Sequence, residues 1–478
     1  MEEDLKYRTK KALYWSFINQ AFTYGMSFAV GIAMARMLTP EDYGITALPA
    51  VFMAIARILI DAGLSAALVR KPEVTEEDLS TAFYYSIGVG VFCYLVLFFT
   101  SPLIAQFYHT PVLTDLVRIT SLVFLWGPLG TPQTVLLQRK LDFKTPARIS
   151  ITNKVVSSIL GISAALMGYG LWALVISTLA SSFLEVFQLW LAVQWYPKAR
   201  WSKESFKYLW GFGNKMIATY LINTLYANIG PVFMGRFSGA AQLGDYNRAK
   251  QYVMLPSSNV AGIITNVTLP VMSQIQDDDS RLESNYRRMI RLSGFVLFPV
   301  MMLLAALARP LVILMVTEKW EGCIYLMQIL CFVFMWQPIH ILNMNVLQVK
   351  GRTDLTLKLE IIKKTLGTVL FITALNISVV AFCYADLLMS MIALFINTYY
   401  TGKLINVGYW RQMGDLLPSL LLGFAMFGAV LGVNTLFDNY FVQLAVGGIL
   451  GVAIYVGGAF LFKFDELKDV KYFLNIKK

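Results

Sequence analysis

The sequence predicts an all-α polytopic membrane protein, and three observations lead to that prediction. The 478 residues are 57% hydrophobic and only 14% charged, whereas a soluble domain carries roughly 25% charged residues. The mean hydropathy is +0.60. The apolar residues also come in blocks long enough to cross a bilayer, which takes about 20 residues per helix. Most of the chain therefore faces lipid or protein, and no connector is long enough to build a soluble domain.

The apolar blocks predict about 14 transmembrane helices. In chain order they cover 14–38, 45–68, 82–106, 115–138, 147–168, 171–195, 209–235, 249–272, 291–316, 322–348, 356–377, 380–402, 414–436 and 440–462. Most of the 40 lysines and arginines fall in every second connector, counted from the N-terminal arm. Because basic connectors stay on the cytoplasmic side, both termini are expected in the cytoplasm.

Two stretches far apart in the chain suggest an internal repeat. Residues 34–44 read MARMLTPEDYG and residues 234–244 read MGRFSGAAQLG, with Met, Arg and Gly at matching offsets. The first stretch joins spans one and two, and the second joins spans seven and eight. An even number of spans separates them, so both have the same orientation. This predicts two parallel-repeat six-helix bundles around a central cavity, plus two extra C-terminal helices.

The repeat also predicts how the chain is divided. The basic stretch YPKARWSKESFK would separate the two bundles, and the tail would lie along the cytoplasmic membrane surface. The predicted parts are an N-terminal six-helix lobe (1–195), a cytoplasmic linker (196–208), a C-terminal six-helix lobe (209–403), an appended transmembrane pair (414–462) and an amphipathic tail (463–478).

The motifs of several protein classes are missing from the sequence. There is no GxxxxGK[ST] phosphate loop, and neither His109 nor His340 belongs to an HExxH pair. None of the four cysteines lies in a CxxC pair, so neither a zinc site nor a disulfide framework is expected. The acidic cluster 277–279 is interpreted as a solvated loop, the alternative being a metal-dependent glycosyltransferase site. We expect no enzyme, no cofactor, no metal and, because the basic residues are dispersed, no nucleic-acid partner.

Ionisable residues inside spans are costly in hydrocarbon and usually face a bundle interior or a wet cavity. Arg57 and Asp61 lie one helical turn apart in span two, so they share a face. They form either a structural ion pair or a charged cavity wall. Glu185 in span six and Asp386 in span twelve join Asp61 as candidates for coupling to H⁺ or Na⁺.

The candidates for binding a charged headgroup are basic and amide side chains. Lys154 and Lys215 lie at similar depths in spans five and seven, where a lysine can also snorkel to the lipid headgroups. Amides recur in the first span of each repeat, where they either hydrogen-bond between helices or contact sugar hydroxyls. The headgroup candidates are Arg57, Lys154, Lys215, Asn19, Gln20, Asn214 and Asn223.

Several motifs resemble those of one family. They are ARMLTPEDYG at 35–44, GRFSGAAQLGDYNRAKQ at 235–251, LPVMSQIQDDDSRLESNYRRMIRLSGFVLFPV at 269–300, ARPLVILMVTEKW at 308–320 and KGRTDL at 350–355. In these the chain is similar to the polysaccharide exporters of the MOP (multidrug/oligosaccharidyl-lipid/polysaccharide) superfamily, of the colanic acid and teichuronic acid type. The resemblance implies a V-shaped pair of six-helix lobes around a cavity, and transfer of lipid-linked oligosaccharide across a bacterial cytoplasmic membrane. It implies no fixed binding motif.

These observations lead to one hypothesis with two alternatives. The hypothesis is a flippase for polyprenyl-diphosphate-linked oligosaccharide that works by alternating access and is driven by an ion gradient or membrane potential. Its partners would be the glycan lipid, the bilayer, and the polymerase and glycosyltransferases of the same pathway. A drug or cation antiporter of the same superfamily would favour a cavity dominated by acids and aromatics, whereas the charges inside these spans are mixed with a basic excess. A membrane-embedded glycan polymerase or ligase would need an outer loop longer than 107–114 or 236–248.

Overall fold

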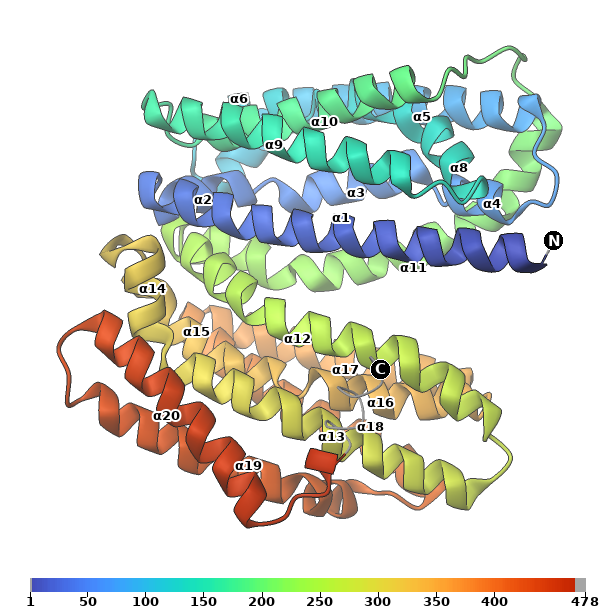
Figure 1. Ribbon diagram of the computed structural model, residues 1–478. Helices are drawn as coiled ribbons and strands as arrows, with labels where there is room; N and C mark the ends of the chain where they lie inside the picture. Colours follow the sequence, from blue (N-terminus) through green and yellow to red (C-terminus); the bar gives the residue numbers. More distant parts are fainter. Residues whose placement is uncertain (1, 469–478) are drawn as a thin grey trace. The chain divides into compact units, whose positions relative to one another are not determined.

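The computed structural model describes residues 2–468, and every regular element in that range is helical. The side chains of residues 2–13, 17, 215, 266 and 267 lie outside the described set. The chain divides into two compact units, residues 1–244 and residues 245–478 (Figure 1). The division into repeat lobes stays a prediction.

The first unit is built from the N-terminal helices together with the first turn of α12. Its elements are α1 (Glu2–Met37), α2 (Pro40–Ala47), α3 (Ala50–Asp61), α4 (Leu64–Arg70), α5 (Glu76–Tyr108), α6 (Leu113–Thr120), α7 (Val123–Trp126), the 3-10 helix η1 (Gly127–Gly130), α8 (Thr131–Arg139), α9 (Lys144–Leu166), α10 (Trp172–Ala192), α11 (Lys203–Phe237) and the start of α12 (Ala240–Gln274).

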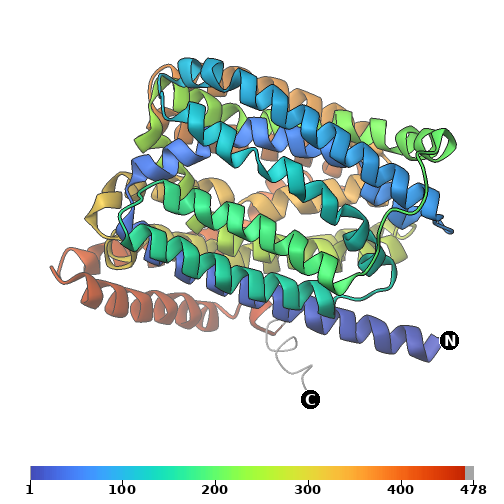
Figure 2. The ribbon, with the colours of Figure 1, turned by 90° about the horizontal axis from the view of Figure 1, so that it is seen from above.

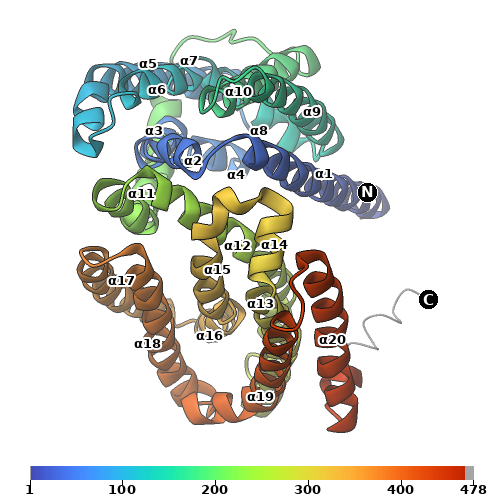
Figure 3. The same cartoon turned by 90° about the vertical axis from the view of Figure 1, so that its left-hand side faces the viewer.

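The second unit contains the rest of α12 and the remaining helices. Its further elements are α13 (Asp279–Ala306), α14 (Ala308–Val316), the 3-10 helix η2 (Glu318–Trp320), α15 (Glu321–Phe334), α16 (Gln337–Val349), α17 (Thr353–Leu375), α18 (Val379–Ile405), α19 (Tyr409–Asn434) and α20 (Tyr440–Leu461). Helices α19 and α20, the predicted appended pair, lie side by side (Figure 3).

The all-helical membrane fold is confirmed, and each predicted span coincides with helical structure. Within the described residues, nine helical segments are long and apolar enough to cross a membrane. Long helices that fall below that apolarity are α1, α11, α12 and α17, which carry many of the polar side chains. The total of about 14 spans stays a prediction.

The second predicted span is interrupted between α3 and α4. Ala62 and Gly63 have φ angles of 46° and 68°, in the left-handed region that glycine tolerates best. Asp61 stabilises this break, because its carboxylate accepts hydrogen bonds from the Ser65 hydroxyl and from the Gly63 amide. Helix α11 packs closely here: a Cβ on Gly213 would lie 2.0 Å from the Ala62 carbonyl oxygen.

The carbonyl groups at the end of α4 are satisfied by a single arginine. The guanidinium of Arg139, the last residue of α8, donates to the carbonyl oxygens of Leu68 at 2.9 Å and Pro72 at 2.7 Å. It also donates to those of Val69 and Lys71. The last carbonyls of a helix have no partner within the helix, so Arg139 fixes where α4 ends.

Replacing this arginine should destabilise the first unit. Arg139→Lys removes the planar fork that reaches several carbonyls together, and each hydrogen bond lost costs about 0.5–1.5 kcal/mol. We expect a lower thermal unfolding midpoint for the purified protein in detergent. The matched control is Arg148→Lys, because Arg148 is exposed on α9. Equal midpoints for the two variants would contradict this structural role.

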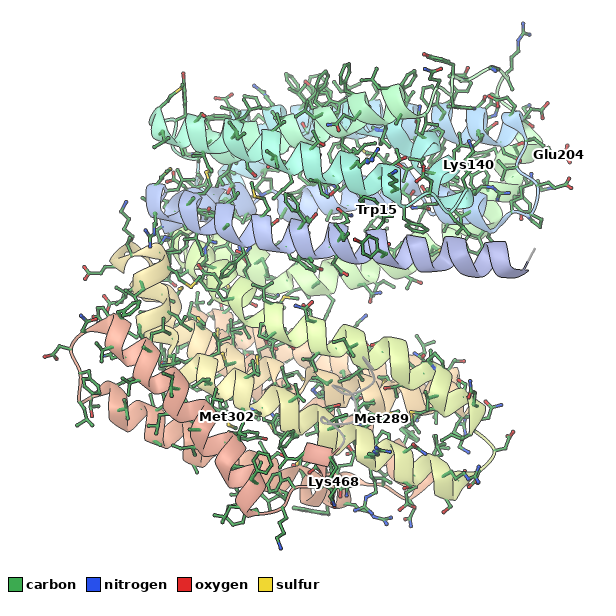
Figure 4. All side chains as sticks on the ribbon, in the orientation of Figure 1. Trp15, Lys140, Glu204, Met289, Met302 and Lys468 are labelled. Carbon is green, nitrogen blue, oxygen red and sulfur yellow. The ribbon has the colours of Figure 1, made fainter. Side chains whose placement is uncertain are left out.

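The start of α9 is held by a capping carboxylate. Asp142 accepts hydrogen bonds from the backbone amides of Lys144 and Thr145 and from the Thr145 hydroxyl. Burial alone would raise the pKa of Asp142, but these hydrogen bonds lower it below its ordinary value. The Lys144 ammonium lies 5.9 Å from the ring centre of Trp15 on α1, which is labelled in Figure 4. Helices α1 and α9 accordingly run side by side (Figures 1 and 2).

The segment predicted as a linker is bound to the start of α5. The Trp195 indole donates to the Glu76 carboxylate at 3.1 Å, just before this segment. Within it, the Ser202 amide donates to the Thr81 hydroxyl at 3.0 Å. These contacts hold residues 196–202 against α5 and lead directly into α11, which packs within the first unit.

Ion pairs and close packing connect α13 to α19 in the second unit. Arg287 binds both carboxylate oxygens of Asp415, at 2.8 and 2.7 Å. Further along α13, the Met302 side chain (labelled in Figure 4) lies against Gly423 of α19. A Cβ on Gly423 would be 2.6 Å from the Met302 sulfur. After α20, Glu466 pairs with Arg291 at 3.3 Å. Most of the predicted amphipathic tail, residues 469–478, lies outside the described residues.

The acidic cluster 277–279 has structural partners. Asp278 caps α13 by accepting a hydrogen bond from the Arg281 amide at 3.0 Å. Asp279 pairs with the Lys350 ammonium at 2.5 Å, and the same ammonium donates to the Gln276 carbonyl. Asp278 therefore caps α13, and Asp279 joins the start of α13 to the turn between α16 and α17.

Candidate functional site

The first unit encloses a polar cavity of about 460 Å³. Four of the predicted in-span charges line it: Arg57 and Asp61 from α3, Lys154 from α9 and Glu185 from α10. These residues belong to three different predicted spans, and the fold brings them together around one cavity. All four side chains thus line one cavity, and their roles in binding or coupling stay predictions.

Hydroxyl groups form most of the remaining polar lining. Helix α10 presents them one turn above another, because side chains three and four residues apart share a face. Two are fixed by neighbours: Ser182 accepts from the Trp126 indole at 3.0 Å, and Ser177 donates to the Ser157 carbonyl at 3.0 Å. The lining hydroxyls are those of Thr131, Ser157, Ser177, Thr178, Ser181 and Ser182. Sequence reasoning missed this hydroxyl ladder, although the spacing STLASSFLE at 177–185 displays it.

A second cavity of about 310 Å³ adjoins the first one. Lys154, Ser181 and Glu185 line both cavities, so they form the partition between them. The small cavity carries no other charge: its remaining polar lining is Thr23, Thr134, Ser150 and Asn153. Both the hydroxyls and the amide can bind water.

The amide Asn19 is connected to the small cavity, whereas Gln20 is not among its lining residues. The Thr23 hydroxyl donates to the Asn19 side-chain oxygen at 3.3 Å and lies 3.5 Å from the Ser150 hydroxyl. Gln20 is exposed on α1. Asn19 thus belongs to a hydrogen-bonded row between α1 and α9, which is the helix-to-helix role that the sequence left open.

The cavity charges balance one another. Two cations and two carboxylates line the larger cavity, and the Arg57 charge acts electrostatically on Glu185. Asp61 has hydrogen-bond donors of its own at the helix break. Arg57 and Glu185 line the same cavity, an arrangement suited to holding an anion or exchanging a cation.

The other predicted site residues lie elsewhere. Asn214 and Asn223 are exposed side chains of α11 and are not among the residues that line either cavity. Lys215 also lies on α11, but its side chain is outside the described residues. Asp386, on α18 of the second unit, interacts electrostatically with Lys250 of α12. Sequence reasoning missed Lys250, whose only signal was its place near the apolar start of span eight.

The described residues contain no cluster of three or more histidine, cysteine or acidic side chains that could hold a metal ion. His340 has two uncharged hydrogen-bond partners: its Nε2 is 3.2 Å from the Ser390 hydroxyl, and its Nδ1 is 3.2 Å from the Asn397 amide nitrogen. Asn343 and Gln412 continue this polar network between α16 and α19. Its contacts indicate a packing role between helices.

Sequence comparisons relate the chain to proteins of surface-glycan biosynthesis. It is 27% identical over 416 residues to the teichuronic acid biosynthesis protein TuaB of Bacillus subtilis (strain 168), covering 86% of each chain. It is 26% identical over 379 residues to the lipopolysaccharide biosynthesis protein WzxC of Escherichia coli (strain K12), covering 78% of this chain and 75% of that protein.

Comparison with solved structures addresses the fold. The chain superposes on the lipid II flippase MurJ with a TM-score of 0.74 at 14% identity, covering 94% of this chain and 99% of MurJ. A multidrug resistance MATE family transporter of the MOP superfamily gives a TM-score of 0.58 at 15% identity, covering 82% of this chain and 99% of the transporter. The fold of this polytopic membrane protein is thus the one those transporters share. The family model for the polysaccharide biosynthesis proteins matches residues 33–325, and the chain belongs to that family.

Proposed function

We propose that this protein is a flippase that moves polyprenyl-diphosphate-linked oligosaccharide, the repeat unit of a surface polysaccharide, across the cytoplasmic membrane of a bacterium. Both termini would lie in the cytoplasm. The observation that carries the proposal is the cavity in the first unit, where Arg57 and Lys154 lie among a ladder of hydroxyls. Family membership and the relatives named for teichuronic acid and lipopolysaccharide biosynthesis support it.

The chemistry of the cavity matches the part of the substrate that needs help. A diphosphate-linked glycan carries two negative charges and many hydroxyls, and placing such groups in hydrocarbon without partners costs many kcal/mol. Arg57 and Lys154 supply the opposite charge, and the serine and threonine hydroxyls can hydrogen-bond with sugar hydroxyls. The prenyl chain is apolar and can remain in the bilayer.

Transport needs the cavity to open alternately to each side of the membrane, as in transporters built from repeats. The sequence carries no nucleotide-binding loop, so the proposed energy source is an ion gradient or the membrane potential. Asp61, Glu185 and Asp386 remain the proposed ion-coupling residues. Lys215, Asn214 and Asn223, all on α11, remain proposed contacts of the glycan.

Reconstitution tests the function directly. The purified protein is placed in vesicles that contain a labelled polyprenyl-diphosphate oligosaccharide in both leaflets, and a membrane-impermeant glycosidase is added outside. Without transfer between leaflets, the glycosidase can reach only the outer half of the label. We expect nearly all of the label to become accessible when the protein is present. Accessibility equal to that of protein-free vesicles would contradict the proposal.

One observation favours a second candidate, a cation antiporter. The larger cavity contains two carboxylates, Asp61 and Glu185, which can bind a lipophilic cation. The same vesicles, loaded with an outward proton gradient, would then accumulate a fluorescent lipophilic cation. Flipping without such accumulation separates the two functions.

A further inference from the structure

Resting on the proposed function, we infer that a proton binds Glu185 together with the diphosphate headgroup, so that proton and headgroup occupy the first unit at the same time. The larger cavity holds the headgroup against Arg57 and Lys154. The smaller cavity gives the proton a separate route to the same glutamate. Glu185 thereby becomes the residue that couples the two ligands.

The charge balance of the larger cavity favours protonation of one carboxylate when the diphosphate binds. The larger cavity is lined by Arg57, Lys154, Asp61 and Glu185, so its charges sum to zero when both carboxylates are ionised. A diphosphate diester would add two negative charges to a space that already contains two carboxylates. Protonation of Glu185 removes one of these and leaves both cations available to the diester. Like charges in one low-dielectric site disfavour each other strongly.

Of the two carboxylates in the larger cavity, Glu185 is the one that takes up the proton. Asp61 is tied to the helix break, because its carboxylate accepts hydrogen bonds from the Ser65 hydroxyl and the Gly63 amide. Glu185 accepts no such hydrogen bonds in the described contacts and lines the same cavity as Arg57, whose charge acts on it. The charged groups around it are Arg57 and Asp61 from α3 and Lys154 from α9, whereas the lining from α7, η1 and α8 is uncharged. A proton on Glu185 therefore releases Arg57 for an anionic ligand.

Glu185 lines both cavities, so the proton can reach it by a path that the headgroup does not occupy. The headgroup would fill the larger cavity, which blocks access to Glu185 from that side. The small cavity reaches the same carboxylate past Thr23, Ser150 and Asn153, whose polar groups can hold water or relay a proton. Leu137 and Pro146 also line the small cavity. These two residues flank the turn at 140–143, which the charge distribution predicts to be cytoplasmic.

The inference has a defined sign. If the free protein has Glu185 ionised and the complex has it protonated, binding takes up one proton. Affinity must then rise as the pH falls, by up to about tenfold per pH unit. The dependence flattens at a pH low enough to protonate Glu185 in the free protein. A site that exchanged a proton for the headgroup would show the opposite sign.

Binding to the full-length protein in detergent tests this. The probe is UDP-glucose, a diphosphate diester whose own charge does not change between about pH 6 and about pH 8. Titration calorimetry in two buffers of different ionisation enthalpy gives both the affinity and the number of protons taken up. We expect uptake of one proton and tighter binding at the lower pH. This measurement on the unmodified protein does not depend on any variant folding correctly.

Variants assign the effect to the residue. Glu185→Gln should bind the probe tightly at both pH values and take up no proton. The matched control is Glu204→Gln, because Glu204 lies in the first turn of α11 (labelled in Figure 4) and should behave like the unmodified protein. Pronounced pH dependence in Glu185→Gln, or proton release by the unmodified protein, would overturn the inference.

The route of the proton is tested by its rate. Ser150→Leu adds bulk to the small cavity and should slow proton uptake, followed with a pH dye after rapid mixing with UDP-glucose, while the equilibrium affinity stays unchanged. An unchanged rate would overturn the assignment of the small cavity. These binding experiments do not depend on flipping. If binding takes up a proton but the vesicle assay shows no transfer, the proposed function is refuted and this inference is not. If the vesicle assay shows transfer but binding takes up no proton, this inference is refuted and the proposed function is not.

Discussion

Arg57→Gln is expected to slow the transfer of lipid-linked oligosaccharide in vesicles by about 10- to 100-fold, because a hydrogen bond to a charged group contributes about 1.5–3 kcal/mol. Arg57 faces the larger cavity from α3 and is the cation that acts on Glu185. With glutamine in its place, Lys154 would be the one cation of the cavity lining left to offset the charge of the diphosphate. In cells, surface polysaccharide should fall correspondingly while the abundance of the protein in the membrane stays the same.

Two further variants make this result specific. Arg57→Lys keeps the charge but loses the planar guanidinium, so an intermediate rate is expected. Arg148→Gln removes a positive charge from an exposed position of α9 in the same unit and should leave the rate unchanged. If Arg57→Gln transfers the glycan as fast as the unmodified protein, the cavity in the first unit is not the headgroup site.

The cavity charges could be predicted from the sequence because an ionisable side chain is costly in hydrocarbon. An arginine or a carboxylate in the middle of an apolar span must find water or a partner. Arg57, Asp61, Lys154 and Glu185 satisfy that condition within one cavity. The same reasoning could not decide between partners that are distant in sequence, so it gave no sign that Arg57 acts on Glu185 rather than only on Asp61.

What the sequence could not predict were contacts made by the backbone. Arg118 makes such a contact, because its Nε donates to the Phe98 carbonyl at 3.3 Å. That carbonyl would normally accept from the amide of residue 102, which is a proline and has none. Ser101 donates to the same oxygen. Such a pairing depends on the fold bringing α6 beside α5, and residue spacing alone contains no trace of it.

The two echoing stretches meet in the structure at their glycines. Gly44 and Gly244 are each the fifth residue of their helix, α2 and α12. A Cβ on Gly44 would lie 1.7 Å from the Ala240 carbonyl oxygen, and a Cβ on Gly244 would lie 1.9 Å from the Pro40 carbonyl oxygen. Each glycine thus lies against the first residue of the other helix. A reciprocal contact of this kind is what a two-fold axis between repeats requires.

Either glycine should therefore resist even the smallest side chain. Gly→Ala inside a helix normally stabilises by about 1 kcal/mol, but at Gly44 or Gly244 the added carbon would overlap a backbone carbonyl, and overpacking costs about 1–3 kcal/mol. We expect Gly44→Ala and Gly244→Ala to lower the thermal midpoint of the purified protein. Gly262→Ala, also on α12, has nothing within 4 Å and should not lower it.

The double variant decides whether the two glycines form one contact. Independent sites give additive losses of stability, whereas residues that share a contact do not. Once Gly44→Ala has pushed the two helix turns apart, the Pro40 carbonyl has also moved away from Gly244, so the second alanine meets little further resistance. We expect Gly44→Ala/Gly244→Ala to lose clearly less stability than the sum of the single variants. An additive loss would mean that the glycines act separately, and the sequence echo would then mark two similar turns without a shared axis.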